Sequence, residues 1–119
     1  MAKEQRTGRC HCGKVKYEAT IDLSEPALEC NCSHCEIKGL LLIFVPRSDV
    51  QMLQGEEDLS EYRFNSKSIA HLFCKHCGVQ VFGRGKKKDG TLSSGINVRT
   101  IDDIDLSKIT RIPYDGRSR

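Results

Sequence analysis

Seven cysteines in 119 residues, gathered in three short motifs, constrain this chain more than any other feature. The motifs are Cys10-His-Cys12, Cys30-Asn-Cys32-Ser-His-Cys35 and Cys74-Lys-His-Cys77. Thiols this close along the chain make poor disulfide partners, because a disulfide needs Cα atoms several ångströms apart that face each other. They suit one tetrahedral metal ion, and the odd total divides naturally into four plus three. Four thiolates close a structural zinc site, whereas three leave one coordination position open for chemistry.

A secreted disulfide scaffold is the alternative to metal binding, and such a protein normally has a signal peptide and an even number of cysteines. The first nine residues contain no apolar segment of the kind that a secretory signal needs. The longest apolar run, Leu40–Val45, is too short to cross a bilayer. We therefore expect a cytoplasmic chain with no membrane partner, whose reduced cysteines bind metal.

Composition predicts one domain over residues 1–119, since no linker or repeat divides the chain. A hydrophobic content of 38% and the absence of Trp indicate a modest core, which metal binding would reinforce. The formal charge of +3 counts neutral thiols. Seven thiolates outweigh two Zn²⁺ ions by about three charges, so the metallated chain is close to neutral. This argues against a nucleic-acid partner, although Lys86–Lys88 form one basic patch that could contact phosphate.

The periodicity predicts a mainly β fold of short strands, a sandwich or an open barrel. Val15, Tyr17 and Ala19 alternate with polar residues, as in a half-buried strand. Further strands are expected over residues 40–45, where Pro46 would stop the strand, and over 50–53, 59–64, 69–73, 79–81 and 92–98. Residues 84–90 should form a solvated hairpin tip, and only 100–106 look helical.

Cys10, Cys12, Cys74 and Cys77 are predicted to form one closed structural zinc site that links the first strand to the middle of the chain. Each pair is followed by a glycine, Gly13 or Gly78. Glycine permits the positive φ that aims backbone N–H groups at the sulfurs.

Cys30, Cys32 and Cys35 can surround a second metal without a distant partner. Two interpretations of this site stay open. In one, a histidine (His34, His11, His71 or His76) or a carboxylate completes a second structural zinc site. In the other, the fourth position is exchangeable. Three thiolates over-neutralise Zn²⁺, so such a site should acidify water weakly and favour an incoming soft thiol.

At these residues the chain also resembles the glutathione-dependent formaldehyde-activating enzyme family, which includes centromere protein V. The resemblance covers about residues 8–106 and is carried by Gly8–Tyr17, Cys30–Cys35, Phe73–Phe82 and Ile96–Arg99. It implies an Mss4-like fold of packed antiparallel sheets. It also implies that Cys10, Cys12, Cys74 and Cys77 bind structural zinc, and that Cys30, Cys32 and Cys35 bind the catalytic zinc at which glutathione is joined to formaldehyde.

Two classes of function follow. The chain would be a zinc-dependent carbon–sulfur lyase, binding a small thiol and adding it to an aldehyde, with Asn97 as a polar contact near the site. Arg47, Arg63 and Arg99 are the candidates for binding the carboxylates of glutathione. The alternative is a non-enzymatic, zinc-stabilised adaptor that binds protein or nucleic acid. The sequence carries no signal for an oligomeric state.

Overall fold

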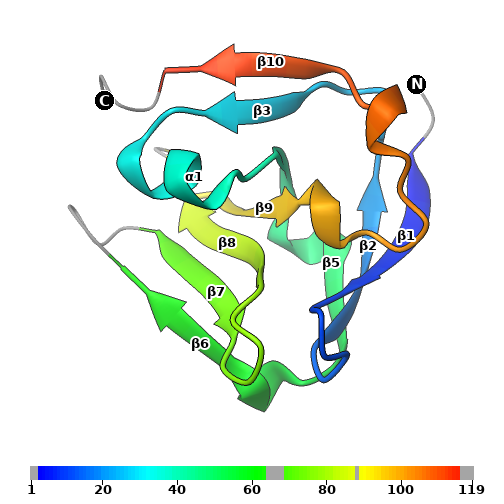
Figure 1. The fold of residues 1–119 in the computed structure, drawn as a ribbon, viewed down its shortest axis with the longest axis vertical. Coiled ribbons are helices and arrows are strands. Elements are labelled where there is room, and N and C mark those ends of the chain that lie inside the picture. Colours follow the sequence, from blue (N-terminus) through cyan, green and yellow to red (C-terminus); the bar gives the residue numbers. More distant parts are fainter. Residues whose placement is uncertain (1–2, 64–68, 88, 116–119) are drawn as a thin grey trace.

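The computed structural model describes residues 3–63, 69–87 and 89–115. Strands dominate the fold (Figure 1). They are β1 (Glu4–Arg9), β2 (Lys16–Ile21), β3 (Ala27–Cys30), β4 (Leu42–Pro46), β5 (Val50–Gln54), β6 (Leu59–Tyr62), β7 (Ala70–Cys74), β8 (Gln80–Lys86), β9 (Leu92–Asn97) and β10 (Arg111–Tyr114). One α-helix of the described residues, α1 (Ser33–Lys38), accompanies four 3₁₀ turns, η1 (Arg47–Asp49), η2 (Glu56–Asp58), η3 (Val98–Thr100) and η4 (Leu106–Lys108).

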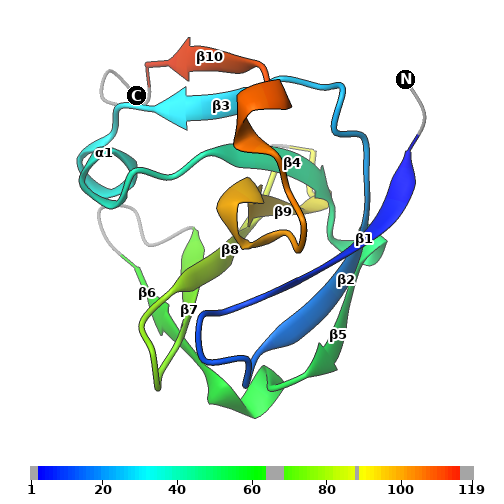
Figure 2. The same ribbon diagram turned by 45° about the vertical axis from the view of Figure 1, so that its right-hand side comes forward.

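The strands form two sheets. The smaller has the order β1-β2-β5, and the larger has the order β10-β3-β4-β9-β8-β7-β6. Every pair is antiparallel except β10 and β3, which run parallel at one edge of the larger sheet. The two sheets lie beside each other in both ribbon views, with β2 crossing behind β1 (Figures 1 and 2).

The main core fills the space between the sheets. Tyr17 of β2 meets Phe82 of β8 edge-on, with ring centroids 5.6 Å apart, and both side chains are fully buried. The opposite face of the larger sheet carries α1. Leu42 pairs with Asn97 in the β4–β9 ladder, and Leu42 packs in a second small cluster with Cys35 and Leu40. Because successive residues alternate between faces, this sheet has an inner face toward the core and an outer face toward α1.

Most of the strand expectations are confirmed, since strands were expected over parts of β2, β4, β5, β6, β7, β8 and β9. The strand ends at Pro46, as expected, with Pro46 as its last residue paired with Ser93. The expectation of a helix over 100–106 is wrong. Ile101 forms a β-bridge with Gly8, and the flanking residues form the turns η3 and η4. Phe64, the last residue of the strand expected over 59–64, lies outside the described residues, and so does Lys88 of the expected hairpin tip.

The one α-helix instead follows the second cysteine motif. Cys32 caps its N-terminus, where its sulfur accepts the backbone N–H of Cys35, and Gly39 ends it with a φ of 67°. Of the helices that the structure describes, none reaches the length and hydropathy that a bilayer crossing requires.

Candidate metal centres

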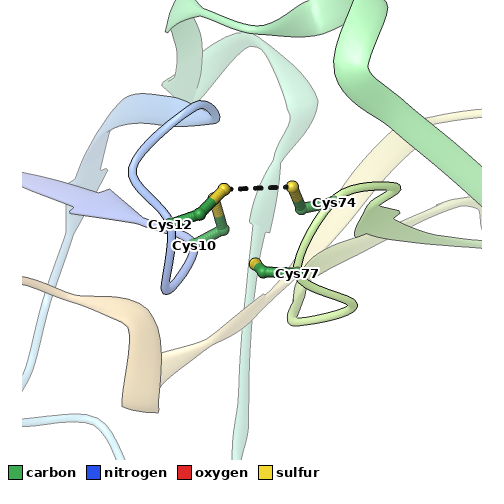
Figure 3. Close-up of side chains that lie close together, drawn as sticks. All are labelled: Cys10, Cys12, Cys74 and Cys77. Carbon is green, nitrogen blue, oxygen red and sulfur yellow. Dashed lines mark hydrogen bonds between the residues drawn. The ribbon is translucent and has the colours of Figure 1, made fainter.

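The four-cysteine cluster joins the two sheets. Cys10 and Cys12 follow β1, Cys74 ends β7 and Cys77 precedes β8, and the four sulfurs lie within 4.8 Å of one another. Their side chains point into one shared space (Figure 3). The sulfur of Cys12 is 3.6 Å from those of Cys10 and Cys74. Four sulfurs bound at about 2.3 Å to a tetrahedral Zn²⁺ lie about 3.8 Å apart, so this donor set fits such an ion.

Two matching turns present these sulfurs. Gly13 and Gly78 both have a φ of 83°, which confirms the prediction of positive φ after each cysteine pair. Val15 N–H points at the sulfur of Cys10 and His76 N–H at that of Cys74, each at 3.4 Å. Such N–H groups stabilise thiolates, as metal ligands require.

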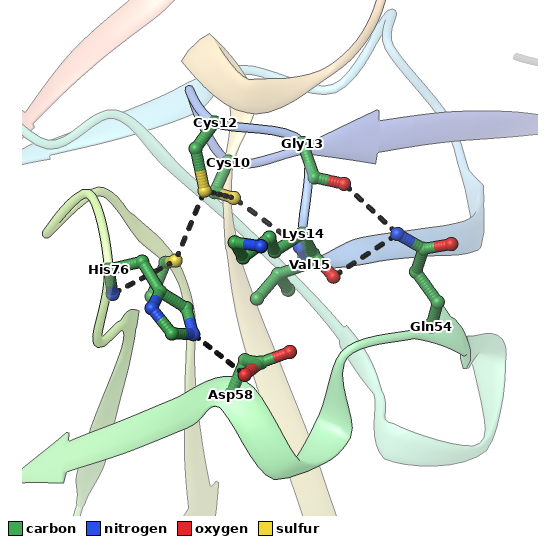
Figure 4. Close-up of polar contacts among 9 residues, drawn as sticks. Cys10, Cys12, Gly13, Lys14, Val15, Gln54, Asp58 and His76 are labelled. Carbon is green, nitrogen blue, oxygen red and sulfur yellow. Dashed lines mark hydrogen bonds and ion pairs between the residues drawn. The ribbon is translucent and has the colours of Figure 1, made fainter.

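Side chains outside the cluster hold both turns (Figure 4). The amide of Gln54 on β5 donates to the carbonyls of Gly13 and Lys14, at 3.1 and 3.3 Å. His76 Nε2 lies 2.8 Å from an Asp58 carboxylate oxygen, and the imidazole lowers the pKa of that carboxyl. His76 is therefore engaged with Asp58 on the rim of the four-cysteine cluster.

The thiols of this cluster differ in acidity. At Cys77 burial raises the pKa, but hydrogen bonds from the backbone of Val79 and Cys12, together with those of the Cys74 and Cys10 thiols, outweigh burial and bring the pKa to about 6. At Cys12 the backbone of Lys14 lowers the pKa, yet burial and the neighbouring thiols raise it more, to about 11. The difference reflects the repulsion among thiolates crowded together, which a bound cation would relieve.

The three-cysteine cluster is local. The sulfurs of Cys30, Cys32 and Cys35 lie within 4.8 Å of one another, and no histidine or carboxylate of the described residues joins them. Cys32 N–H points at the sulfur of Cys30, at 3.4 Å, and Cys35 N–H at that of Cys32, at 3.3 Å. Cys30 and Cys32 are partly exposed, whereas Cys35 is buried. The cluster can hold a metal ion on the side that the two partly exposed thiols face.

Two elements fix this cysteine loop in place. The C-terminal half of α1 docks on β7 and β8, where the Lys38 ammonium donates to Gln80 Oε1 at 2.8 Å and lies 5.6 Å from the centre of the Phe73 ring. On the other side, β10 pairs with β3, so that Tyr114 lies opposite Cys30. Asn31 N–H donates to the Tyr114 carbonyl at 3.0 Å, and the Asn31 amide donates to Asp115 at 3.1 Å.

The histidines considered as fourth ligands lie in different places. His34 is buried in α1, with its ring centroid 4.0 Å from that of His71 and stacked on Tyr62 at 5.7 Å. Burial, with His71 and Lys38 nearby, lowers the pKa of His34 to about 4, and burial and Lys38 also lower the pKa of His71. The rings of His34 and His71 therefore pack against each other where α1 meets β7. His11 is exposed, and His76 is engaged with Asp58 as described.

Asn97 lies buried on the outer face, beneath α1. Its side-chain Nδ2 donates to the backbone carbonyl of Gln80 at 2.9 Å, and its side-chain Oδ1 accepts the backbone N–H of Arg99 at 3.2 Å. Arg99 Nε in turn donates to the Gly39 carbonyl, at 3.1 Å, behind α1. Arg47 and Arg63 instead lie together on the inner face, at the end of the sheet where β4 and β6 end.

Four residues that position the three-cysteine loop were absent from the sequence expectations: Asn31, Lys38, Gln80 and Asp115. The helix that carries Lys38 had a readable signal, since Ser33-x-x-Glu36 followed by Gly39 is a helix start and stop pattern. The C-terminal strand had none, because parallel pairing of distant strands leaves no local pattern.

Comparisons with known proteins agree with this geometry. The model of the family described as "Glutathione-dependent formaldehyde-activating enzyme" matches residues 5–112. A crystal structure of a Rhodobacter sphaeroides protein superposes with a TM-score of 0.76 at 26% sequence identity, covering 89% of this chain and 99% of that one. The family match spans both cysteine clusters and all ten strands in whole or in part. The chain belongs to the glutathione-dependent formaldehyde-activating enzyme family.

Proposed function

We propose that this protein is a zinc-dependent carbon–sulfur lyase that joins a small thiol such as glutathione to a small aldehyde such as formaldehyde. Cys30, Cys32 and Cys35 would hold the catalytic zinc, and Cys10, Cys12, Cys74 and Cys77 would hold a structural zinc. Family membership supports the reaction type, and the two sulfur clusters support the choice of metal.

The observation that carries this proposal is the asymmetry between the clusters. The first offers four sulfurs from two sheets, which is a complete tetrahedral set. The second offers three sulfurs, two of them partly exposed, from one loop and the first turn of a helix. A three-ligand set that faces solvent is the arrangement that catalytic zinc sites share.

The reaction adds the S–H bond of the thiol across the aldehyde carbonyl. A carbon–sulfur bond forms, the carbonyl π bond breaks, and the proton passes from sulfur to the carbonyl oxygen, giving a hydroxymethyl thioether. Zinc bound at this site would lower the thiol pKa and supply the thiolate nucleophile. Lys38 follows Cys35 by three residues on α1, so both lie on the same side of the helix, and its ammonium would offset the negative charge that accumulates when several sulfurs bind one divalent cation. Gln80 links Asn97 to Lys38 beneath α1, because its backbone carbonyl accepts the Asn97 amide and its side-chain oxygen accepts the Lys38 ammonium. Asn97 remains our candidate for a substrate contact.

Cobalt substitution tests the proposal, because Co²⁺ accepts the same tetrahedral geometry and its absorption bands report sulfur ligation. Adding glutathione to the two-cobalt protein should strengthen the thiolate-to-metal band as a further sulfur binds. The Cys32→Ser variant should lose this response. Ser is itself a good helix N-cap, so this change removes one metal ligand while α1 can still form.

A control is Lys108→Met, because Lys108 is an exposed lysine of η4 that belongs to neither cysteine cluster; this variant should keep the glutathione response. A spectrum insensitive to glutathione and to smaller thiols at millimolar concentration would contradict the lyase proposal. It would favour the zinc-stabilised adaptor.

A further inference from the structure

A second polar site lies on the inner face of the larger sheet, away from both cysteine clusters. A cavity of about 260 Å³ opens there beside β6, β7 and β8, and its lining includes four cationic side chains: Arg47, Arg63, Arg84 and Lys86. The strand ladders place two of these cations beside apolar residues of the cavity, because Arg84 lies opposite Ala70 and Lys86 lies opposite Leu92. Apolar walls are supplied by Ala70, Leu72 and Leu92.

This cavity faces the other way from the three-cysteine loop. In the β6–β7–β8 ladders, Glu61 and Leu72 line the cavity, and Leu72 belongs to the main core. Their neighbours Tyr62 and His71 point to the outer face, where they meet His34 of α1. Alternation along the strands therefore separates the two sites by the thickness of the sheet.

The positive charge in the cavity exceeds the negative charge available to pair with it. Arg63 is paired with Glu61 at 2.9 Å, and Arg84 reaches Glu56 only at 3.4 Å. Within the described residues, Arg47 and Lys86 have no carboxylate partner. The Arg47 Nε atom is also buried without a hydrogen-bond partner there. A buried guanidinium donor without an acceptor costs free energy, which an anion in the cavity would recover.

We propose that this cavity binds a small organic dianion, a phosphate monoester or a dicarboxylate, independently of the thiol chemistry. Arg47 and Lys86, the two cations without carboxylate partners, match a dianion, and the Arg47 guanidinium matches the paired oxygens of phosphate or carboxylate. The apolar walls accommodate a short carbon chain. A concave pocket of about 260 Å³, with apolar residues beside the cations, fits a small ligand better than a polymer, which would need a long basic stripe.

Nuclear magnetic resonance titration of the zinc-loaded protein tests this proposal. Inorganic phosphate and succinate are the probes, at an ionic strength held constant with sodium chloride so that general screening does not change. The Arg47 Nε–H resonance and the amides of Gly85 and Leu92 should shift saturably with at least one probe, and the stronger response identifies the ligand class. Lys86→Met should weaken that binding about 5- to 10-fold. Lys86 is exposed, so the fold should tolerate the change.

Lys108→Met is the matched control, since Lys108 is an exposed lysine of η4 and does not line the cavity. It should leave the affinity within about 2-fold. Resonance shifts that rise linearly with the concentration of both probes would overturn the proposal. An equal loss of affinity in the Lys86→Met and Lys108→Met variants would do the same. So would a single-stranded oligonucleotide that binds through Lys86 more tightly than either probe, because the surface would then be a nucleic-acid contact.

Discussion

Gly8 and Tyr17 show how closely single residues fit where β1 meets β2. They lie opposite each other in the ladder, and a methyl group added at Gly8 would overlap the Tyr17 ring. The ring is held in place, because its hydroxyl lies 2.7 Å from that of Thr100 and it packs against Phe82. Burial also raises the pKa of Tyr17 to about 12, so this hydroxyl stays protonated through the physiological range.

We therefore expect Gly8→Ala to destabilise the protein by about 1–3 kcal/mol through overpacking. Urea unfolding monitored by circular dichroism measures the effect. Gly83→Ala is the control, since the nearest atoms to an added methyl group lie 3.6 Å away, at ordinary contact distance. It should change the free energy of unfolding by less than about 0.5 kcal/mol. Equal losses for both variants would mean that Tyr17 can move aside.

At the scale of elements, the C-terminal strand β10 holds the three-cysteine loop. Its partner β3 leads directly into that loop, and Asn31 bonds to both Tyr114 and Asp115. Asn31→Asp would place two carboxylates against each other, and it should weaken metal binding at the second cluster more than Asn31→Ala does. Metal competition with a chelator measures this, with a loss of about 1 kcal/mol expected for the exposed pair.

The double variant Asn31→Asp with Asp115→Asn tests whether the contact itself matters. It restores a donor and an acceptor in exchanged positions, so it should recover most of the affinity lost in Asn31→Asp. If affinity stays low in the double variant, the effect of the first change comes from charge near the metal and not from the link to β10.

The elements divide into those that local pattern predicts and those that it does not. The alternation of Val15, Tyr17 and Ala19 and the run before Pro46 are local, and both were predicted as strands. The cysteine spacing likewise predicted which sulfurs meet. Strands β1, β3 and β10 have little apolar periodicity, because each is exposed on at least part of one face. The cavity with Arg47 and Arg63 depends on ladder register between distant segments, which spacing along the chain does not contain.

At the scale of the whole molecule, the four-cysteine cluster ties the smaller sheet to the larger one. Cys12 and Cys74 are 62 residues apart, so a metal there closes a long loop. We expect Cys74→Ser to prevent stable folding, because it removes a metal contribution on the order of 10 kcal/mol, comparable to the whole stability of a small domain. Circular dichroism and metal analysis of the purified chain measure this.

Cys32→Ser is the matched control for that prediction. The three-cysteine cluster lies within one loop and cross-links little, so this variant should keep the fold and lose one equivalent of zinc. A Cys74→Ser protein with an unchanged melting temperature would remove the structural assignment. A Cys32→Ser protein that retains two zinc ions would remove the catalytic one.

The parallel pairing of β10 with β3 has a consequence for how the protein is made. A ribosome releases the chain from its N-terminus, so the thiols of Cys30, Cys32 and Cys35 leave the exit tunnel early. The four-sulfur set is complete once Cys77 has emerged, whereas Tyr114 and Asp115 emerge later. Biosynthesis therefore separates the two centres in time. The cross-link between the sheets can be metallated in the nascent chain before the second set of thiols acquires its support from β10.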